Sequence, residues 1–275
     1  MNPRTDRPRC AAHRGGAALW PENSLLAFRN AIALGCDLLE LDVHRTADGE
    51  LAVIHDPTLD RTSDGTGAVA SVTAAELRRA RLRGPDGTLT DERVRLLDDV
   101  LALAAPSRVE LLVEVKGPMP GLGVHWDRGA DGTAVSVPGP RYEGIEETVL
   151  AKLARAGLEA RATVMAFNPA VLERVHALAP RQRTALLVEV YHVEQAGFSP
   201  EAAIGWAVKA GATDAGLHHA LVNEAVVKTA RAAGLRLGAW TVNAEEAMRR
   251  LAALGVDVII SDRPDLLRRV LGLAA

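Results

Sequence analysis

The stretch RLGAWTVNAEEAMRRLAALGVDVIIS, residues 236–261, contains the repeating unit that decides the fold. Short apolar runs at 236–240 and 257–261 show little alternation, which is typical of strands buried on both faces of a sheet. Between them, residues 244–254 follow a helical pattern that ends at Gly255, a residue type common just past a helix end. The unit therefore predicts a strand, a crossover helix and a parallel strand.

The same alternation runs outward from this unit through the whole chain. Eight strands are expected, at residues 9–13, 37–43, 110–115, 162–166, 184–188, 213–217, 236–240 and 257–261. Other helices are expected at residues 24–34, 146–156, 169–178, 200–210, 223–233 and 264–271. With no break in composition between the halves, this α/β pattern favours one domain over residues 1–275, a (β/α)8 TIM barrel. A doubly wound open sheet is the alternative.

Two stretches interrupt the alternation. Residues 51–103 hold an extra strand at 51–54, a loop rich in Gly, Asp and Thr, and two helix-like pieces. Residues 117–142 are rich in Gly and Pro, and their Trp126 could either line a pocket or anchor a loop. In a barrel, both insertions follow the carboxyl ends of strands, which is the face where such barrels place their active sites.

Composition excludes several classes of protein. Hydrophobic residues make up 48% of the 275 residues and charged residues 24%, as in ordinary soluble globular proteins. A net charge of -3 argues against a nucleic-acid binder. No apolar run approaches the ~20 residues that span a bilayer, so we expect no membrane insertion. Two cysteines, Cys10 and Cys36, and a start without an apolar leader fit a cytoplasmic protein.

Carboxylates cluster at the ends of two expected strands. Glu40 and Asp42 lie two residues apart and project to the same side, and Glu114 and Lys116 repeat this relation on the next barrel strand. Three carboxylates at one rim repel one another, and a hard cation such as magnesium or calcium relieves that repulsion. Simple salt bridges at a strand end are the alternative. His44 extends the same face and could be a pocket group or a surface histidine.

Two histidines at strand ends, His13 and His55, suit acid–base chemistry near neutrality. Cleavage of a phosphodiester needs one group to accept a proton and another to protonate the leaving alkoxide. Arg14 offers a planar fork to phosphate oxygens, and Lys116 offers a point charge. Glu22 could orient His13 or Arg14. The alternative for His13 and Arg14 is an ordinary surface pair.

Neighbouring polar residues have local interpretations. Asn23 or Ser24 could cap the first helix. Asp56 and Pro57 are expected to make a turn that fixes His55. The polar residues at 60–64 are expected to form a solvated loop.

In order along the chain, these motifs resemble those of the glycerophosphodiester phosphodiesterase family. The matching segments are His13-Arg14-Gly15, Pro21-Glu22-Asn23-Ser24, Glu40-Leu41-Asp42-Val43, Asp48-Gly49, His55-Asp56-Pro57-Thr58-Leu59-Asp60-Arg61-Thr62, Asp64-Gly65-Thr66-Gly67, Glu114-Val115-Lys116, Trp240-Thr241-Val242-Asn243, Gly255-Val256-Asp257 and Ser261-Asp262-Arg263-Pro264. The resemblance covers nearly the whole chain and implies a (β/α)8 barrel with a small insertion after the second strand.

The resemblance also implies roles for the site residues. The metal ligands would be Glu40, Asp42 and Glu114, the acid–base pair His13 and His55, and the phosphate contacts Arg14 and Lys116. The implied reaction uses a divalent cation, Mg or Ca. It hydrolyses a small-molecule glycerophosphodiester to glycerol 3-phosphate and an alcohol such as choline or ethanolamine.

Some points stay open at this level. Phe167 and Trp240, at expected strand ends, are candidates for packing against the substrate, with core packing as the alternative for Phe167. Ala166 stands where a Ser is common in the family, and Ser24 where Thr is usual. The nucleophile could be water or the glycerol 2-hydroxyl. A lysophospholipase D-like activity and a non-catalytic phosphate-binding barrel are the rival functions.

Overall fold

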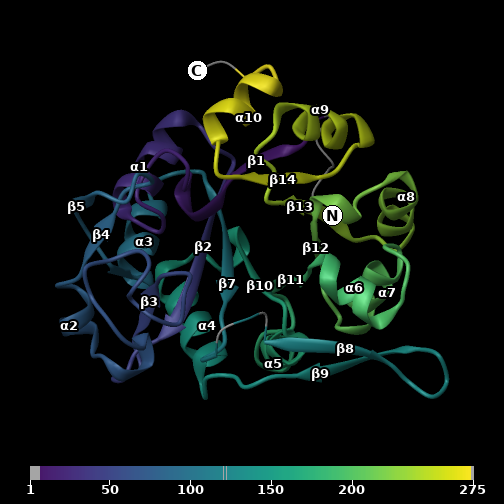
Figure 1. Cartoon of the computed structure of the whole chain (residues 1–275), viewed down its shortest axis with the longest axis horizontal. Helices are drawn as coiled ribbons and strands as arrows, with labels where there is room; N and C mark the ends of the chain where they lie inside the picture. Colours follow the sequence, from purple (N-terminus) through teal and green to yellow (C-terminus); the bar gives the residue numbers. More distant parts are fainter. Residues whose placement is uncertain (1–6, 120, 122, 274–275) are drawn as a thin grey trace.

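Eight parallel strands close into a barrel in the computed structural model, which describes residues 7–119, 121 and 123–273 (Figure 1). In sheet order they are β1 (Arg9–Ala12), β2 (Leu38–Arg45), β7 (Glu110–Val115), β10 (Ala162–Ala166), β11 (Arg183–Val188), β12 (Asp214–His218), β13 (Arg236–Trp240) and β14 (Val258–Ser261). The ring closes because β1 pairs with both β14 and β2. The expected barrel is confirmed, and the open doubly wound sheet is wrong.

Helices surround the ring of strands (Figure 1). They are α1 (Leu25–Leu34), α3 (Leu97–Ala104), α4 (Ile145–Ala156), α5 (Pro169–Leu178), α6 (Val190–Ala196), α7 (Ala202–Lys209), α8 (Glu224–Ala232), α9 (Glu245–Leu254) and α10 (Pro264–Val270). The sequence pattern did not predict the short α6. Within the described part of the chain, no helix is both long enough and apolar enough to cross a membrane.

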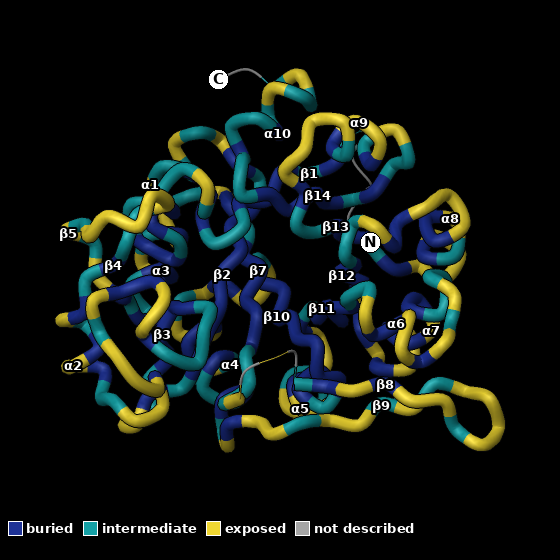
Figure 2. Tube along the Cα trace, in the orientation of Figure 1, coloured by how far each residue is buried: buried dark blue, intermediate teal, exposed yellow. Residues whose placement is uncertain are grey.

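The barrel strands form the buried centre of the molecule, and exposure rises toward the outer helices (Figure 2). On β2, the apolar Leu39, Leu41 and Val43 are fully buried in the main hydrophobic core. The residues between them, Glu40 and Asp42, are buried as well. Strand alternation thus separates apolar packing from a polar face on the same strand, as the sequence predicts.

The insertion after β2 is a small layer with its own core. Strand β3 (Leu51–Val53) pairs antiparallel with β2, and β6 (Arg95–Leu96) pairs with β3. A short helix, α2 (Ala74–Leu77), and a hairpin of β4 (Arg81–Arg83) and β5 (Leu89–Arg93) complete it. A second apolar cluster fills its interior, formed by Ala52, Ile54, Leu59, Val69, Ala74, Leu77, Ala80, Leu82, Val94 and Leu96. The extra strand was predicted; the hairpin was not.

A second hairpin projects from the stretch after β7 (Figure 1). Its strands are β8 (Val124–Arg128) and β9 (Ala134–Pro138), which the sequence pattern did not predict. Trp126 is 3% exposed and stacks on Trp206 of α7, with ring centroids 4.2 Å apart and planes 10° from parallel. Trp126 therefore anchors the hairpin against the barrel's outer layer, which decides between its two sequence interpretations.

Candidate active site

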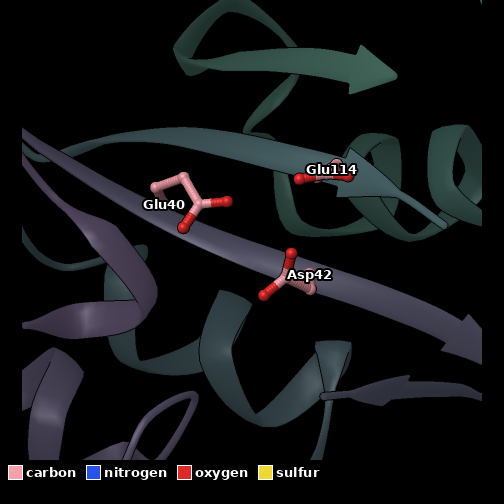
Figure 3. A group of neighbouring side chains, drawn as sticks. All are labelled: Glu40, Asp42 and Glu114. Carbon is pink, nitrogen blue, oxygen red and sulfur yellow. The ribbon is translucent and has the colours of Figure 1, made fainter. Parts of the chain in front are cut away.

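Three carboxylates meet inside the mouth of the barrel (Figure 3). Glu40 and Asp42 come from β2, and Glu114 comes from β7, where it pairs in register with Asp42. One oxygen of each lies within 4.8 Å of the others, and the three residues are only 2%, 0% and 7% exposed. The strand spacing thus brings together the acidic residues that the sequence singles out.

Two cations lie against this acidic cluster. The Nζ atom of Lys116 is 2.6 Å from Glu114 Oε1 and 3.1 Å from Asp42 Oδ1. The Nε atom of Arg14 is 3.4 Å from Asp42 Oδ2. Burial acts to raise the pKa of Asp42, but Lys116 and Arg14 outweigh it and hold that pKa well below its ordinary value.

The charge of Glu40 is balanced by nearby cations less than the charges of Asp42 and Glu114 are. Its Oε2 accepts a bond from the backbone N–H of Arg14 at 2.8 Å, and His13 Nε2 lies 3.8 Å away. Burial, and then the charge of Asp42, raise the pKa of Glu40 to about 7. Three carboxylates facing two cations leave one negative charge without a partner in this buried cluster.

The cluster fits a small divalent cation. Asp42 Oδ1 is buried and has the Lys116 ammonium at 3.1 Å as an ion-pair partner, but it accepts no well-aligned hydrogen bond within the described part of the chain. Buried polar atoms nearly always have a partner, so such an oxygen is a candidate metal ligand. The donor set of Glu40, Asp42 and Glu114 is all oxygen, which suits hard cations such as magnesium or calcium.

His13 is held by a carboxylate from the other end of the chain. It opens the short 3-10 turn His13–Gly15 directly after β1, and its Nδ1 lies 2.6 Å from Asp262 Oδ1. Asn243 donates to Asp262 Oδ2 at 2.7 Å and so fixes that carboxylate. Burial lowers the pKa of His13, but Glu40 and Asp262 outweigh it, so the net shift is upward.

His55 has a matching arrangement. Its Nδ1 lies 2.7 Å from Oδ1 of Asp56, the residue that follows it. Arg61 is exposed in the expected polar loop, yet it donates to Asp56 Oδ2 at 2.6 Å and to both oxygens of Glu22. Burial lowers the pKa of His55, although Asp42 opposes that shift. Glu22 also accepts from Arg14 at 3.0 Å.

His44 supports the site from behind and is not a surface histidine. Its Nε2 lies 2.9 Å from the backbone oxygen of His55, and its Nδ1 lies 3.0 Å from the hydroxyl of Tyr142. A backbone oxygen only accepts, so Nε2 carries the hydrogen and Nδ1 accepts from the phenol. Burial lowers the pKa of His44 to about 4, which keeps the ring neutral while it holds the backbone of His55.

The turn after β1 shapes the other side of the site. Ser24 caps α1 by accepting from Ala27 N–H at 3.0 Å, while Asn23 takes a different role. Asn23 Nδ2 donates to Asp42 Oδ2 at 2.9 Å, and its φ of 59° places it in the left-handed region. Gly15 is required nearby, because a Cβ there would lie 2.7 Å from the Cβ of Ala27.

Two cavities meet at these residues. One of about 390 Å³ is lined by His55, Glu114, Lys116 and Phe167, and it extends past His44 toward Arg141 and Asn168. The other, of about 240 Å³, is lined by the same four residues and also by His13, Arg14, Glu40, Glu189 and Trp240. Phe167 and Trp240 therefore line a cavity as well as packing together, with centroids 5.5 Å apart.

Sequence reasoning placed Asp56 in the turn that fixes His55, but it missed Asp262 as the partner of His13 and the contacts made by Asn23 and Tyr142. Asp262 directly follows β14, so its place at the carboxyl end of the last barrel strand was a usable signal. Asn23 was assigned only as a possible cap, and Tyr142 received no role. Neither contact has a sequence signal, because the partners of Asn23 and Tyr142 lie 19 and 98 residues away along the chain.

Comparison with known proteins identifies a family that matches this chain. The model of the glycerophosphoryl diester phosphodiesterase family matches residues 13–266 of this chain. The chain belongs to that family. A glycerophosphodiester phosphodiesterase of Caldanaerobacter subterraneus subsp. tengcongensis is 31% identical over 259 residues, covering 93% of this chain and 94% of that protein. One from Bacillus altitudinis is 32% identical over 260 residues, covering 92% and 94%.

Two solved structures share the barrel. A glycerophosphodiester phosphodiesterase from Agrobacterium tumefaciens superposes with a TM-score of 0.74 at 25% identity, covering 95% of this chain and 99% of that one. A phosphodiesterase from Oleispira antarctica, solved with the product sn-glycerol-3-phosphate, gives a TM-score of 0.74 at 22% identity and covers 97% of both chains. The resemblance stated from the sequence motifs is thereby confirmed.

Proposed function

We propose that this chain hydrolyses glycerophosphodiesters to sn-glycerol 3-phosphate and an alcohol, with a divalent cation at the acidic cluster. The supporting observation is that both carboxylate-bound histidines, His13 and His55, line one cavity together with Glu40, Glu114 and Lys116. A phosphodiester in that cavity meets an acid, a base and positive charge at once.

The two imidazoles share one design. Asp262 and Asp56 are ionised carboxylates and can only accept hydrogen bonds, so Nδ1 carries the hydrogen in both His13 and His55. Each Nε2 is then left for chemistry. A neutral ring accepts the nucleophile's proton at Nε2, and a protonated ring donates from Nε2 to the oxygen of the leaving alcohol. Each carboxylate stabilises the imidazolium form of its partner.

Arg14 and Lys116 supply positive charge for the phosphate. Both line the cavity with the histidines, and both hold positions set by carboxylates. Arg14 Nε faces Asp42 Oδ2 at 3.4 Å and Arg14 Nη1 donates to Glu22, so the two carboxylates hold the guanidinium at the edge of the cavity, where it can meet a phosphate oxygen. Fixed donors of this kind stabilise the charge that develops on the equatorial oxygens without reorganisation.

Glu40, Asp42 and Glu114 would hold the divalent cation, magnesium or calcium. When bound, such a cation neutralises charge on the phosphate oxygens and acidifies a nearby hydroxyl. Asn23 contributes by fixing the Asp42 carboxylate through its 2.9 Å hydrogen bond. The backbone N–H of Arg14 fixes Glu40 in the same way.

The test is turnover of glycerophosphocholine, glycerophosphoethanolamine and glycerophosphoglycerol, coupled to detection of glycerol 3-phosphate. We expect turnover that EDTA abolishes and that magnesium or calcium restores. Lysophosphatidylcholine, assayed in parallel, addresses the lysophospholipase D-like rival. Binding of a diester without release of any product would instead support a non-catalytic barrel.

The nucleophile is tested with the substrate. A diester whose glycerol 2-hydroxyl is replaced by hydrogen cannot form a cyclic phosphate. Unchanged turnover of that analogue would establish water as the nucleophile. Loss of turnover with retained binding would establish attack by the 2-hydroxyl, with water opening the cyclic product in a second step.

A further inference from the structure

The smaller cavity continues beyond the phosphate-binding groups to an acidic residue outside the metal cluster. Its lining also includes Phe167, Leu187, Glu189 and Trp240. Glu189 directly follows β11, and Trp240 ends β13, so both stand at the carboxyl ends of barrel strands. This part of the cavity is therefore positioned to bind one of the two alcohol groups that are esterified to the phosphate.

Glu189 carries a charge that the protein does not neutralise. Within the described part of the chain, no lysine or arginine makes an ion pair with it, and the nearest basic atom is His218 Nδ1 at 4.0 Å. That nitrogen accepts a hydrogen bond from Ala220 N–H, so it has no hydrogen to offer the carboxylate. The Glu189 side chain accepts from backbone N–H groups of the first turn of α6, including that of Val190 at 2.8 Å, and so caps this helix.

Aromatic rings stand beside this carboxylate. Phe167 and Trp240 pack edge to face with planes at 90°, and His218 packs against Trp240 in the same manner at 5.6 Å between centroids. Aromatic faces attract cations, with tryptophan the strongest, and the attraction grows where water is excluded. A carboxylate without a basic partner beside a tryptophan forms a site for a positively charged ligand.

Among the described residues, the larger cavity holds no carboxylate that lacks a basic partner. Beyond the catalytic residues, its lining includes Arg141 and the neutral His44 and Asn168. Its two carboxylates, Asp56 and Glu114, are paired with Arg61 and Lys116, so neither is left for an ammonium group. The two cavities therefore favour different alcohol groups of the phosphodiester. The cavity with Glu189 favours a cationic alcohol, and the cavity with Arg141 favours a neutral polyol.

We propose that Glu189 is a specificity-determining residue that, with Trp240 and Phe167, binds the ammonium group of the substrate's head-group alcohol. This inference rests on the proposed function, since it assigns one arm of the diester to each cavity. It names the preferred substrates as glycerophosphodiesters of amino alcohols, and it gives Glu189 a role in choosing the substrate and none in breaking its bond.

The test compares two substrates that differ by one charge. Glycerophosphocholine carries a trimethylammonium group, and the diester of 3,3-dimethylbutanol replaces that nitrogen by carbon at nearly the same shape. We expect the wild type to favour the choline diester by about tenfold in kcat/KM. Glu189→Gln, which keeps the oxygen that caps α6, should bring this ratio close to one. Glu189→Asp, which keeps the charge, should retain a ratio clearly above one.

The control is Glu194→Gln on α6, where the carboxylate is exposed and lines neither cavity. It should leave the ratio at the wild-type value. A wild-type ratio near one, or a ratio that Glu189→Gln leaves unchanged because both substrates slow alike, would overturn the proposal. Absence of cation-dependent turnover of either diester would instead be a failure of the proposed function, and the two results are separate.

Discussion

His13 Nδ1 lies 2.6 Å from Asp262 Oδ1, although the two residues are 249 positions apart in the chain. The contact exists because β1 and β14 are neighbours in the closed ring, with Ala12 paired to Ser261. The residues that follow both strands therefore emerge side by side at the mouth of the barrel. Ring closure is thus what completes this imidazole–carboxylate pair.

Asp262→Asn should lower kcat by about 10²-fold while leaving the fold intact. The asparagine removes the charge that stabilises the imidazolium of His13. Because Asp262 helps to raise the pKa of His13, the limb of the pH–rate profile that belongs to His13 should move to lower pH. Asp265→Asn, a nearby carboxylate paired with Arg263, is the control and should change neither kcat nor the profile. An unshifted profile in Asp262→Asn would contradict the role given to the pair.

His13→Ala and His55→Ala should each reduce kcat by about 10²–10⁴-fold, because each removes one of the two proton-transfer groups. The double variant should be little slower than the slower single variant, since residues that act as one unit are not additive. Steady-state kinetics with glycerophosphocholine measures this, with circular dichroism to check folding. Near-normal rates in either single variant would remove that ring from the mechanism.

Glu40→Gln should stabilise the metal-free protein at alkaline pH. The folded-state pKa of Glu40 is raised from 4.5 to about 7, so the native state holds this proton more tightly than the unfolded chain. The free energy of unfolding must then fall as pH rises through that interval. With EDTA at about pH 8, the variant should exceed the wild type by on the order of 2 kcal/mol, and the two should converge at about pH 4, below the unfolded-state pKa.

The comparison isolates Glu40, because Asp214, whose pKa burial also raises to about 7, titrates in both proteins. Added magnesium or calcium should reverse the order, since a ligand that binds the native state stabilises it and the variant has lost one carboxylate. Urea unfolding across pH provides the measurement. A variant less stable than the wild type at every pH would mean that Glu40 is not under charge repulsion.

The barrel and its acidic cluster were within reach of the sequence because both follow from short-range periodicity. A strand alternates faces every residue, so Glu40 and Asp42 had to share a side, and apolar neighbours placed the strand in the interior. The order of strands around a closed barrel then brought Glu114 beside Asp42. These steps need only local pattern and one topological rule.

The contacts that support the site could not be predicted from the sequence, because they depend on how loops fold over the barrel mouth. Arg61 sits in a polar loop with nothing in its pattern to separate it from solvated neighbours, yet it joins Glu22 to Asp56. Asn23 looked like a helix cap because that is what asparagine most often does there. Its positive φ, which turns its amide toward Asp42, is set by the packing of the turn.

Trp126→Ala should release the β8–β9 hairpin without unfolding the barrel. Trp126 contributes the hairpin's stacking contact with Trp206, and truncating a buried tryptophan costs about 3 kcal/mol. That loss raises the population of the detached hairpin by about 100-fold. Hydrogen exchange of the β8 and β9 amides, and tryptic cleavage after Arg128, should accelerate accordingly while the barrel strands keep their protection.

Val137→Ala, a change at a side chain 49% exposed on the same hairpin, should accelerate neither. Equal protection in wild type and Trp126→Ala would show that the hairpin is held by other contacts, such as Arg128 over Phe198.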